Sequence, residues 1–411
     1  MTLTLPGSLP KFEQKLAFTV WIFHSLAAFC LAFQMSNGPI QKWLKHWMKD
    51  SDYLDGWKHD ASDAEWTFYR TAFPHILMNY AASSLGIFLV RAIFMPRTAR
   101  IVTIGIGFVA QTLNYSLYTC NTDRLDLEKA LLYFAYLPYS ITLIVLFEDF
   151  SIQIDRCDIQ PRLTMDRAKL VFTKFLRLVF WFSFIETFLH LIHVNSIFNS
   201  PFTIVEELPF YQICATAYLA GQFFHVKYII IFGVPAFFAF VDGMTPPPPP
   251  ICISRVSLYS RMWRYFDNGL YQFLKHQVYI KIMSPKLPRC LSVLRAIGAL
   301  IAVFSVVLAW HGTRTHYVYW VSLSAFELII EKIGWAIWQT ENCQKLRAYL
   351  GENVTRRILA TLMLLNVTPG IFGVFFFLGQ DGVGEAVFRK VVVKGFSDIF
   401  TFNISIFKYF V

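Results

Sequence analysis

Two groups of polar residues in this sequence interrupt long apolar stretches and have side chains that can do chemistry. His311 ends an apolar run of about twenty residues and is followed by Gly312. An imidazole takes up or releases a proton near neutral pH, so a histidine at this depth can act in catalysis. It can equally have a structural role. Upstream, Trp263, Arg264 and Asp267 in the sequence WRYFD place charge and aromatic surface beside a hydrophobic helix.

The second polar group lies within one apolar stretch. Glu186, His190 and His193 have the spacing i, i+4 and i+7, which places them on one face of a helix. Histidine and glutamate on one face can bind a metal ion or pass protons. Such a face can also line a polar cavity or be satisfied by neighbouring helices. The sequence leaves both interpretations open.

Further ionisable residues fall at membrane depth, where each is costly unless it has a partner or a function. His225 and Lys227 either line a cavity or extend their polar ends to the membrane surface. Glu327, Glu331 and Lys332 have the spacing of an internal ion pair. None of these residues by itself indicates a particular activity.

Helices that cross a membrane must position these residues, because the composition is that of an integral membrane protein. Of the 411 residues, 55% are hydrophobic and 18% aromatic. Only 16% are charged, against about 25% in soluble domains. The mean hydropathy is +0.46. These values argue against a water-soluble enzyme, a disordered chain and a disulfide-stapled secreted module.

The net charge of +10 arises from 37 basic and 27 acidic residues. In a chain with this much lipid-facing surface it indicates basic cytoplasmic loops, and no nucleic-acid partner is expected. The seven cysteines are odd in number and form no CxxC pair, which argues against a disulfide framework and a structural zinc site. No metal site is expected.

Windows of about 20 apolar residues predict the membrane spans. They cover residues 16–34, 73–95, 101–119, 130–148, 170–192, 211–241, 292–311, 317–338, 357–378 and 394–411. The first is longer than the core of a signal peptide and is expected to be retained. The stretch 211–241 is too long for one straight span and contains Gly233 and Pro235, so we expect it to be tilted or broken. The predicted fold is all-α, with about ten transmembrane helices plus membrane-embedded or interfacial helices in a single domain over residues 1–411.

Basic residues are concentrated in alternate connections between these windows. Residues 252–291 are densely basic, whereas residues 193–210 contain no Lys or Arg. By the positive-inside rule we expect an even number of spans, with both ends of the chain in the cytoplasm. The hydrophobic residues Leu270, Phe273 and Leu274 recur at helical spacing and predict a helix in or just under the membrane interface.

The region from residue 222 to residue 312 carries an ordered set of motifs. It reads FFHVKYIIIFGVPAFFAFVDGMTPPPPPICIS, then MWRYFDNGL, then AWHG after an apolar span. This combination resembles the membrane-bound O-acyltransferase family and is most similar to its hedgehog acyltransferase branch. Weaker similarity continues through DAEWTFY at residues 63–69 and FFFLGQDGVG at residues 375–384.

The resemblance implies two catalytic residues. His311 matches the family's histidine in its intramembrane helix, and Asp267 matches the second polar position. We expect His311 to act as general base, and Asp267 to orient the nucleophile or donate to the oxyanion. The residues expected to bind CoA or the acyl chain are Arg261, Trp263, Arg264, Tyr265 and Trp310.

The resemblance also implies a cofactor. Cys252 follows the proline run and matches a position that looks like a haem-iron ligand in hedgehog acyltransferases. The alternatives for this thiol are palmitoylation or a free juxtamembrane cysteine. The chain departs from the family pattern at Lys281, where a proline is expected, and near residues 136–150, where an N-G-P-I element is missing. These departures bear on the acceptor more than on the chemistry.

The implied function is transfer of a long-chain acyl group from palmitoyl-CoA, or a similar acyl-CoA, to the N-terminal cysteine amine of a secreted hedgehog-like protein. The implied location is the endoplasmic reticulum, or the Golgi. One alternative is O-acylation of a lipid or glycolipid. Another is a catalytically silent regulator of acylation, although such a protein is expected to lack the histidine. A transporter is disfavoured, because the sequence shows no inverted repeats with paired broken helices.

Overall fold

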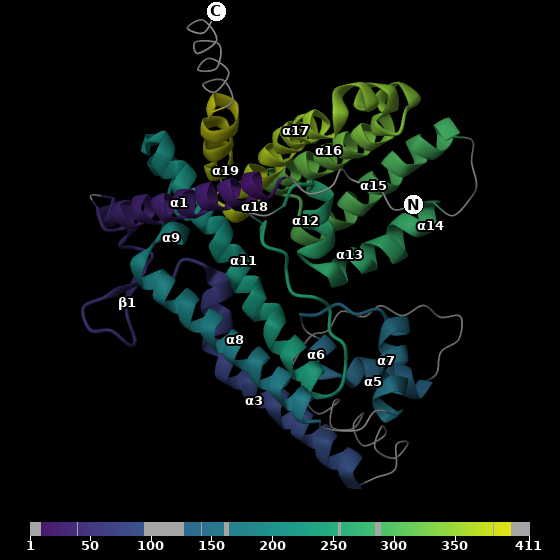
Figure 1. The fold of residues 1–411 in the computed structure, drawn as a ribbon. Coiled ribbons are helices and arrows are strands. Elements are labelled where there is room, and N and C mark those ends of the chain that lie inside the picture. Colours follow the sequence, from purple (N-terminus) through teal and green to yellow (C-terminus); the bar gives the residue numbers. More distant parts are fainter. Residues whose placement is uncertain are drawn as a thin grey trace, which may run out of the picture.

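The computed structural model describes residues 10–38, 40–93, 127–140, 142–159, 164–253, 256–283, 289–380 and 382–395. Its long helices are α1 (Lys11–Ser36), α3 (Ala64–Ile93), α8 (Met165–Leu191), α11 (Phe210–Val241), α15 (Arg289–His311), α16 (Thr315–Trp338) and α17 (Glu341–Gly373). In Figure 1, α3, α8 and α11 lie together, and α15, α16 and α17 form a second group.

Short helices and one hairpin connect the long helices. The short helices are α2 (Gln41–Leu44), α5 (Leu127–Ala135), α6 (Leu137–Ser140), α7 (Phe147–Ile159), α9 (Val194–Phe198), α10 (Phe202–Glu207), α12 (Tyr259–Tyr265), α13 (Asn268–Leu274), α14 (Ile280–Met283), α18 (Phe375–Leu378) and α19 (Val383–Val387). Two π-helical turns, η3 (Lys275–Tyr279) and η4 (Phe388–Lys394), extend α13 and α19. Strands β1 (Met48–Asp50) and β2 (Lys58–Asp60) pair antiparallel, with Met48 opposite Asp60.

The all-α membrane architecture expected from the sequence is confirmed. Five helical stretches of the described chain are long and apolar enough to cross a membrane: Lys11–Ser36, Ala64–Val90, Phe210–Val241, Leu294–His311 and Glu341–Leu378. Each overlaps a predicted window, although Ala64–Val90 and Glu341–Leu378 begin well before theirs. Windows 170–192 and 317–338 fall on α8 and α16, which are long but have at least three charged residues in every stretch of 18. Window 101–119 and nearly all of window 394–411 lie outside the described residues.

The prediction of one span over residues 130–148 is wrong. This stretch forms α5, α6 and the start of α7, separated by non-helical residues. Its apolar side chains, including Leu132, Tyr133 and Val145, are buried against one another and against Ala239 of α11. Hydropathy measures only the apolar character of a segment, and here that character reflects burial inside the protein.

Helix α11 is the centre of the first helix group. It packs against α1, α3 and α8, and apolar side chains surround it along most of its length. Such a helix is buried on all sides. Pro235 lies within α11 without ending it, so the expected break is wrong. Its 32 residues correspond to about 48 Å, more than the hydrocarbon core of about 30 Å, which leaves the expected tilt as a prediction.

Lys227 of α11 ties this helix to the start of α3. Its ammonium lies 2.8 Å from Asp63 and 2.9 Å from Glu65, and only 3% of the residue is exposed. Asp63 also accepts a hydrogen bond from the backbone N–H of Trp66. Lys227 therefore forms a buried ion pair. It neither lines the cavity nor extends to the membrane surface, the two interpretations that the sequence offered.

Glu186 and His190 on the polar face of α8 contact polar groups of neighbouring segments. The Glu186 carboxylate accepts hydrogen bonds from Trp66 Nε1 at 3.0 Å and pairs with Arg70 Nε at 3.1 Å. His190 bonds through Nε2 to Ser51 Oγ at 2.8 Å. Within the described residues, no group of three or more His, Cys, Asp or Glu side chains is placed to hold a metal ion. The structure thus gives Glu186 and His190 partners on neighbouring segments, whereas His193 lies beyond the end of α8 and its buried Nε2 has no hydrogen-bond partner among the described residues.

The β1–β2 hairpin is fastened to α9 by one carboxylate. Asp60 is 1% exposed. Its Oδ1 accepts from the N–H and Oγ of Ser62 and from Oγ of Ser196, and its Oδ2 accepts from the N–H of Ser196. A buried carboxylate is stable when all its oxygens have donors, and this one has four.

We expect Asp60→Ala to lower the stability of the protein by about 2–4 kcal/mol, because four donors lose their acceptor in a buried site. Thermal unfolding in detergent and limited proteolysis of residues 45–62 provide the measurement. The control is Asp50→Ala on the same hairpin, because the Asp50 side chain is exposed and pairs only at the surface with Lys58. Equal losses of stability in the two variants would contradict this prediction.

The same hairpin carries a histidine that resists protonation. Burial, and then the charge of Arg70, lower the pKa of His59 from 6.5 to about 4. Below pH 6.5 the unfolded chain therefore binds a proton that the folded chain does not. Folding stability should fall by about 1.4 kcal/mol per pH unit between about pH 6.5 and pH 4. Melting temperatures of wild type and His59→Asn across this range should converge as the pH falls; parallel curves would refute the prediction.

Candidate active site

A cavity of about 830 Å³ opens between the two helix groups. Its lining comes from α11, α12, α13, η3, α15, α16, α17 and α18. His311 and Asp267, predicted as a catalytic pair, both line it. Four of the five predicted binding residues also line it: Arg261, Trp263, Arg264 and Tyr265. The structure therefore brings together residues from α12, α13 and α15 that are far apart in sequence.

Trp310 is the exception among the predicted binding residues. It is not part of the cavity lining, and 55% of the residue is exposed. Consecutive residues of a helix point about 100° apart, so Trp310 faces away when His311 faces the cavity. The expected role of Trp310 in binding CoA or the acyl chain is not supported by this geometry.

His311 is the last residue of α15, and Gly312 ends the helix. Gly312 has a positive φ of 102°, and its N–H donates to the carbonyl of Leu308 at 2.9 Å. A left-handed residue at this position is the usual way to end a helix, and glycine adopts it without a steric penalty. The His-Gly pair therefore has a structural reason: the glycine stops the helix directly after the histidine.

Three aromatic rings surround the imidazole of His311. The ring centroids of Trp320 and Phe377 lie 5.3 and 5.0 Å away, nearly perpendicular to the imidazole, and that of Tyr317 lies 6.3 Å away. Edge-to-face packing at these distances favours one ring orientation. Phe377 belongs to the FFFLGQDGVG motif, which was the one feature of the sequence that could have indicated its contact with His311. Trp320 was missed because no sequence pattern connected it with His311.

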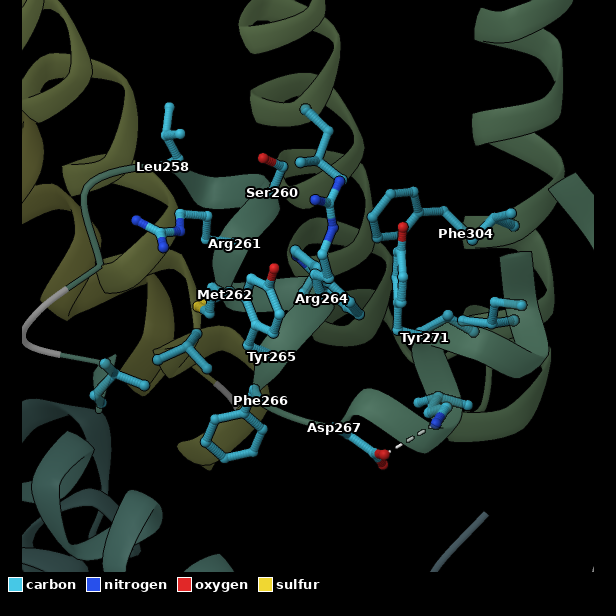
Figure 2. A pocket seen from close by; sticks show the side chains of 18 of the residues that line it. Leu258, Ser260, Arg261, Met262, Arg264, Tyr265, Phe266, Asp267, Tyr271 and Phe304 are labelled. Atoms are coloured by element: carbon cyan, nitrogen blue, oxygen red, sulfur yellow. Dashed lines mark hydrogen bonds between the residues drawn. The ribbon is translucent and has the colours of Figure 1, made fainter. Parts of the chain in front are cut away.

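Asp267 caps the N-terminus of α13. Its backbone is extended, with φ −123° and ψ 91°, and Oδ1 accepts from the N–H of Leu270 at 2.9 Å (Figure 2). Burial raises the pKa of the Asp267 carboxyl above its usual range, although the Leu270 and Gly269 amides oppose the shift. The interfacial helix expected here is therefore two helices, α12 and α13, with the aspartate at the break.

A close backbone contact fixes the first turn of α13. A Cβ atom placed on Gly269 would lie 2.1 Å from the carbonyl oxygen of Ile144. Only glycine allows two backbones to approach this closely. The segment before α7 thus supports the turn that carries Asp267. It belongs to the stretch 136–150, where the N-G-P-I element of the family is missing.

Cationic side chains line the cavity beyond this pair. Arg264 lies 5.9 Å from the ring of Tyr265 and 5.5 Å from that of Tyr271. Figure 2 shows Arg261 and Arg264 on either side of Tyr265. The π-helical turn η3 adds Lys275, which also lines the cavity. Together these groups provide positive charge next to an otherwise apolar space.

The predicted ion pair on α16 is replaced by contacts to other helices. Lys332 donates to the hydroxyl of Tyr279 at 2.8 Å. Glu331 accepts hydrogen bonds from the N–H and hydroxyl of Ser260. All four residues line the cavity. Their partners lie on η3 and α12, and the spacing within one helix could not reveal them.

Cys252 lies at the edge of this region. Its neighbour Ile253 lines the cavity, whereas Cys252 itself is half-buried outside the lining. The cavity therefore does not place a large flat cofactor against this thiol. The proline run before it, Pro246 to Pro250, is non-helical, as expected from the sequence, and follows the end of α11 at Val241.

The family can now be assigned by comparison with known proteins. A model of the membrane-bound O-acyltransferase family matches residues 44–364, which include both His311 and Asp267. The chain belongs to this family. The similarity that the motifs indicated is thereby confirmed, and it extends over more than half of the chain.

Three curated relatives are similar to part of this acyltransferase-family chain. The Drosophila melanogaster protein-cysteine N-palmitoyltransferase Rasp is 30% identical over 223 residues, covering 54% of this chain and 43% of Rasp. The mouse protein-cysteine N-palmitoyltransferase HHAT is 29% identical over 220 residues, covering 53% and 43%. The mouse HHAT-like protein is 26% identical over 212 residues, covering 52% and 41%. The matches thus span less than half the length of these relatives.

The contact at Gly269 makes a prediction about the site. We expect Gly269→Ala to destabilise the protein by about 1–3 kcal/mol, because the added methyl group pushes the Ile144 backbone away. Gly298→Ala is the matched control, since a Cβ there meets nothing within 4 Å and Gly298 lies inside α15. Alanine should stabilise that helix by about 0.5–1 kcal/mol. Thermal unfolding of both variants checks whether stability falls in Gly269→Ala and rises in Gly298→Ala.

Proposed function

We propose that this protein transfers a long-chain acyl group, palmitoyl, from acyl-CoA to the N-terminal cysteine amine of a secreted hedgehog-like protein. The single observation that carries the proposal is that His311 and Asp267 line one cavity. That cavity combines apolar walls with cationic groups, as a fatty acyl-CoA requires. The similarity to the protein-cysteine N-palmitoyltransferases Rasp and HHAT supports the choice of a cysteine amine as acceptor.

The reaction is attack of the amine nitrogen on the thioester carbonyl carbon. His311 takes the proton that the amine loses, while the carbonyl oxygen becomes an oxyanion. The C–S bond then breaks, and the CoA sulfur leaves with a proton. An α-amine has a reference pKa of about 7.7–8.0, so it is partly deprotonated near neutral pH and asks little of the base. A hydroxyl acceptor would ask far more.

Asp267 is suited to the oxyanion. Burial raises the pKa of the Asp267 carboxyl, and in its protonated form this carboxyl can donate a hydrogen bond to developing negative charge. Asp267 also caps α13: the N–H of Leu270 donates to its Oδ1, and this hydrogen bond fixes the orientation of the carboxyl. Orientation of the amine by the ionised carboxylate is the alternative role.

The acyl chain and the CoA phosphates of the acyl donor fit different walls of the cavity. Leu300, Val303 and Phe304 of α15 give the cavity an apolar side for the acyl chain. Arg261, Arg264 and Lys275 offer charge to the phosphates of CoA. Arg255, a further basic residue of the segment 252–291, lies outside the described residues. The cytoplasmic location of these groups, opposite a luminal acceptor, is part of the proposal.

The remaining expectations rest on the resemblance. A thiolate such as Cys252 can ligate haem iron, but the cavity does not reach this thiol, and no step of the transfer involves it. The membrane location is that of the family, and we propose the endoplasmic reticulum or the Golgi as the organelle.

Microsomes containing the protein, supplied with labelled palmitoyl-CoA and a peptide with an N-terminal cysteine, test the function. We expect label on the peptide, no label when its amine is blocked, and a loss of about 10²–10⁴-fold in His311→Ala. His316→Ala is the matched control, because His316 lies on the next helix and outside the cavity lining. Labelled lipid that depends on His311 would instead indicate O-acylation of a lipid. No transfer at all would favour a silent regulator.

A further inference from the structure

We infer that Glu331 is a positioning residue, which fixes α12, and through α12 the carboxyl of Asp267, relative to His311. The inference rests on the proposed function and concerns the same site. Glu331 lies on α16 and lines the cavity. It has no assigned part in the chemistry of the transfer.

Glu331 supplies the hydrogen-bond acceptor that the start of α12 lacks. The residue before this helix is Leu258, whose side chain cannot accept a hydrogen bond, and no side-chain cap is formed there. Glu331 Oε2 accepts from the N–H of Ser260 at 2.9 Å, and Oε1 accepts from its hydroxyl. The first amides of a helix have no partner within the helix. A carboxylate from another helix therefore fastens the first turn of α12.

A second contact between α12 and α16 fixes the register. The hydroxyls of Tyr259 and Ser324 are 2.9 Å apart, and both residues are buried. Ser324 and Glu331 are seven residues apart, so they lie on one face of α16. On its other side, Tyr259 packs against Gly370 of α17, where a Cβ atom would lie 2.5 Å from the ring. The first turn of α12 is thus held between two spans.

The same face of α16 also contacts the catalytic histidine. Trp320 lies four residues before Ser324; its ring stacks on Trp263 of α12 at 5.7 Å and meets the imidazole of His311 at 5.3 Å. Asp267 follows α12 after one residue. A slide or rotation of α12 along α16 would therefore move Asp267 while His311 stays in place. A misplacement of about 1 Å can cost about 100-fold in rate.

The chemistry of the anchor separates positioning from other roles of a carboxylate. In Glu331→Gln the amide oxygen can accept from the N–H of Ser260, and the amide nitrogen can donate to the Ser260 hydroxyl. The glutamine therefore preserves two hydrogen bonds without a charge or a transferable proton. Alanine preserves neither. A role in proton transfer or cation binding would make glutamine as damaging as alanine.

The test compares Glu331→Ala, Glu331→Gln, Ser260→Ala and the Glu331→Ala/Ser260→Ala double variant of the full chain. Purified protein is assayed with labelled palmitoyl-CoA and the cysteine peptide. We expect kcat to fall about tenfold or more in Glu331→Ala, with KM for palmitoyl-CoA within about threefold of wild type. Glu331→Gln should stay within about twofold of wild type, and the double variant should be no slower than Glu331→Ala. Glu341→Ala, an exposed glutamate at the start of α17, is the control.

Hydrogen exchange of the amides in residues 259–265 provides a readout that does not depend on activity. Exchange should speed up in Glu331→Ala and remain as in wild type in Glu331→Gln. The inference is overturned if glutamine is as slow as alanine, if Glu331→Ala keeps its kcat, or if exchange is unchanged in both variants. A wild type that transfers no acyl group contradicts the proposed function alone, because the exchange measurement still tests the anchor.

Discussion

The arrangement of the site depends on one aromatic side chain, Trp320, which packs against Trp263 and His311. Through it, the end of one span and the helix before Asp267 share a common support. Aromatic packing is suited to this task, because edge-to-face and stacked contacts favour particular ring orientations. The remaining contacts of α12 and α13 adjust the site around this support.

Several polar groups within the bundle have their partners on another segment of the chain. Lys227 of α11 pairs with Asp63 at the start of α3. Glu186 of α8 contacts Trp66 and Arg70, which also belong to α3. Water is scarce in this region, so an unpaired group would cost several kcal/mol. These pairs join α3 to α8 and α11, and α11 in turn lines the cavity.

The sequence could predict the parts of the site that depend on local pattern. His311 with Gly312 at the end of an apolar window, and the WRYFD motif, are features of contiguous residues, and the structure places them in one cavity. The sequence could not predict partners that are distant along the chain, such as Ser260 for Glu331. The sequence also misled in two places. A segment buried by protein is as apolar as one surrounded by lipid, so residues 130–148 were predicted to be a membrane span. Trp310 is next to His311 in sequence, but its side chain faces away from the cavity.

Both proposed catalytic side chains stand at the ends of helices, His311 at the last residue of α15 and Asp267 just before α13. Their positions are therefore set by where α13 begins and where α15 ends. The connecting segment can accumulate substitutions, such as Lys281 in place of the family's proline, without displacing either group. A family built in this way can diverge in the surfaces that choose an acceptor while its reaction centre stays the same.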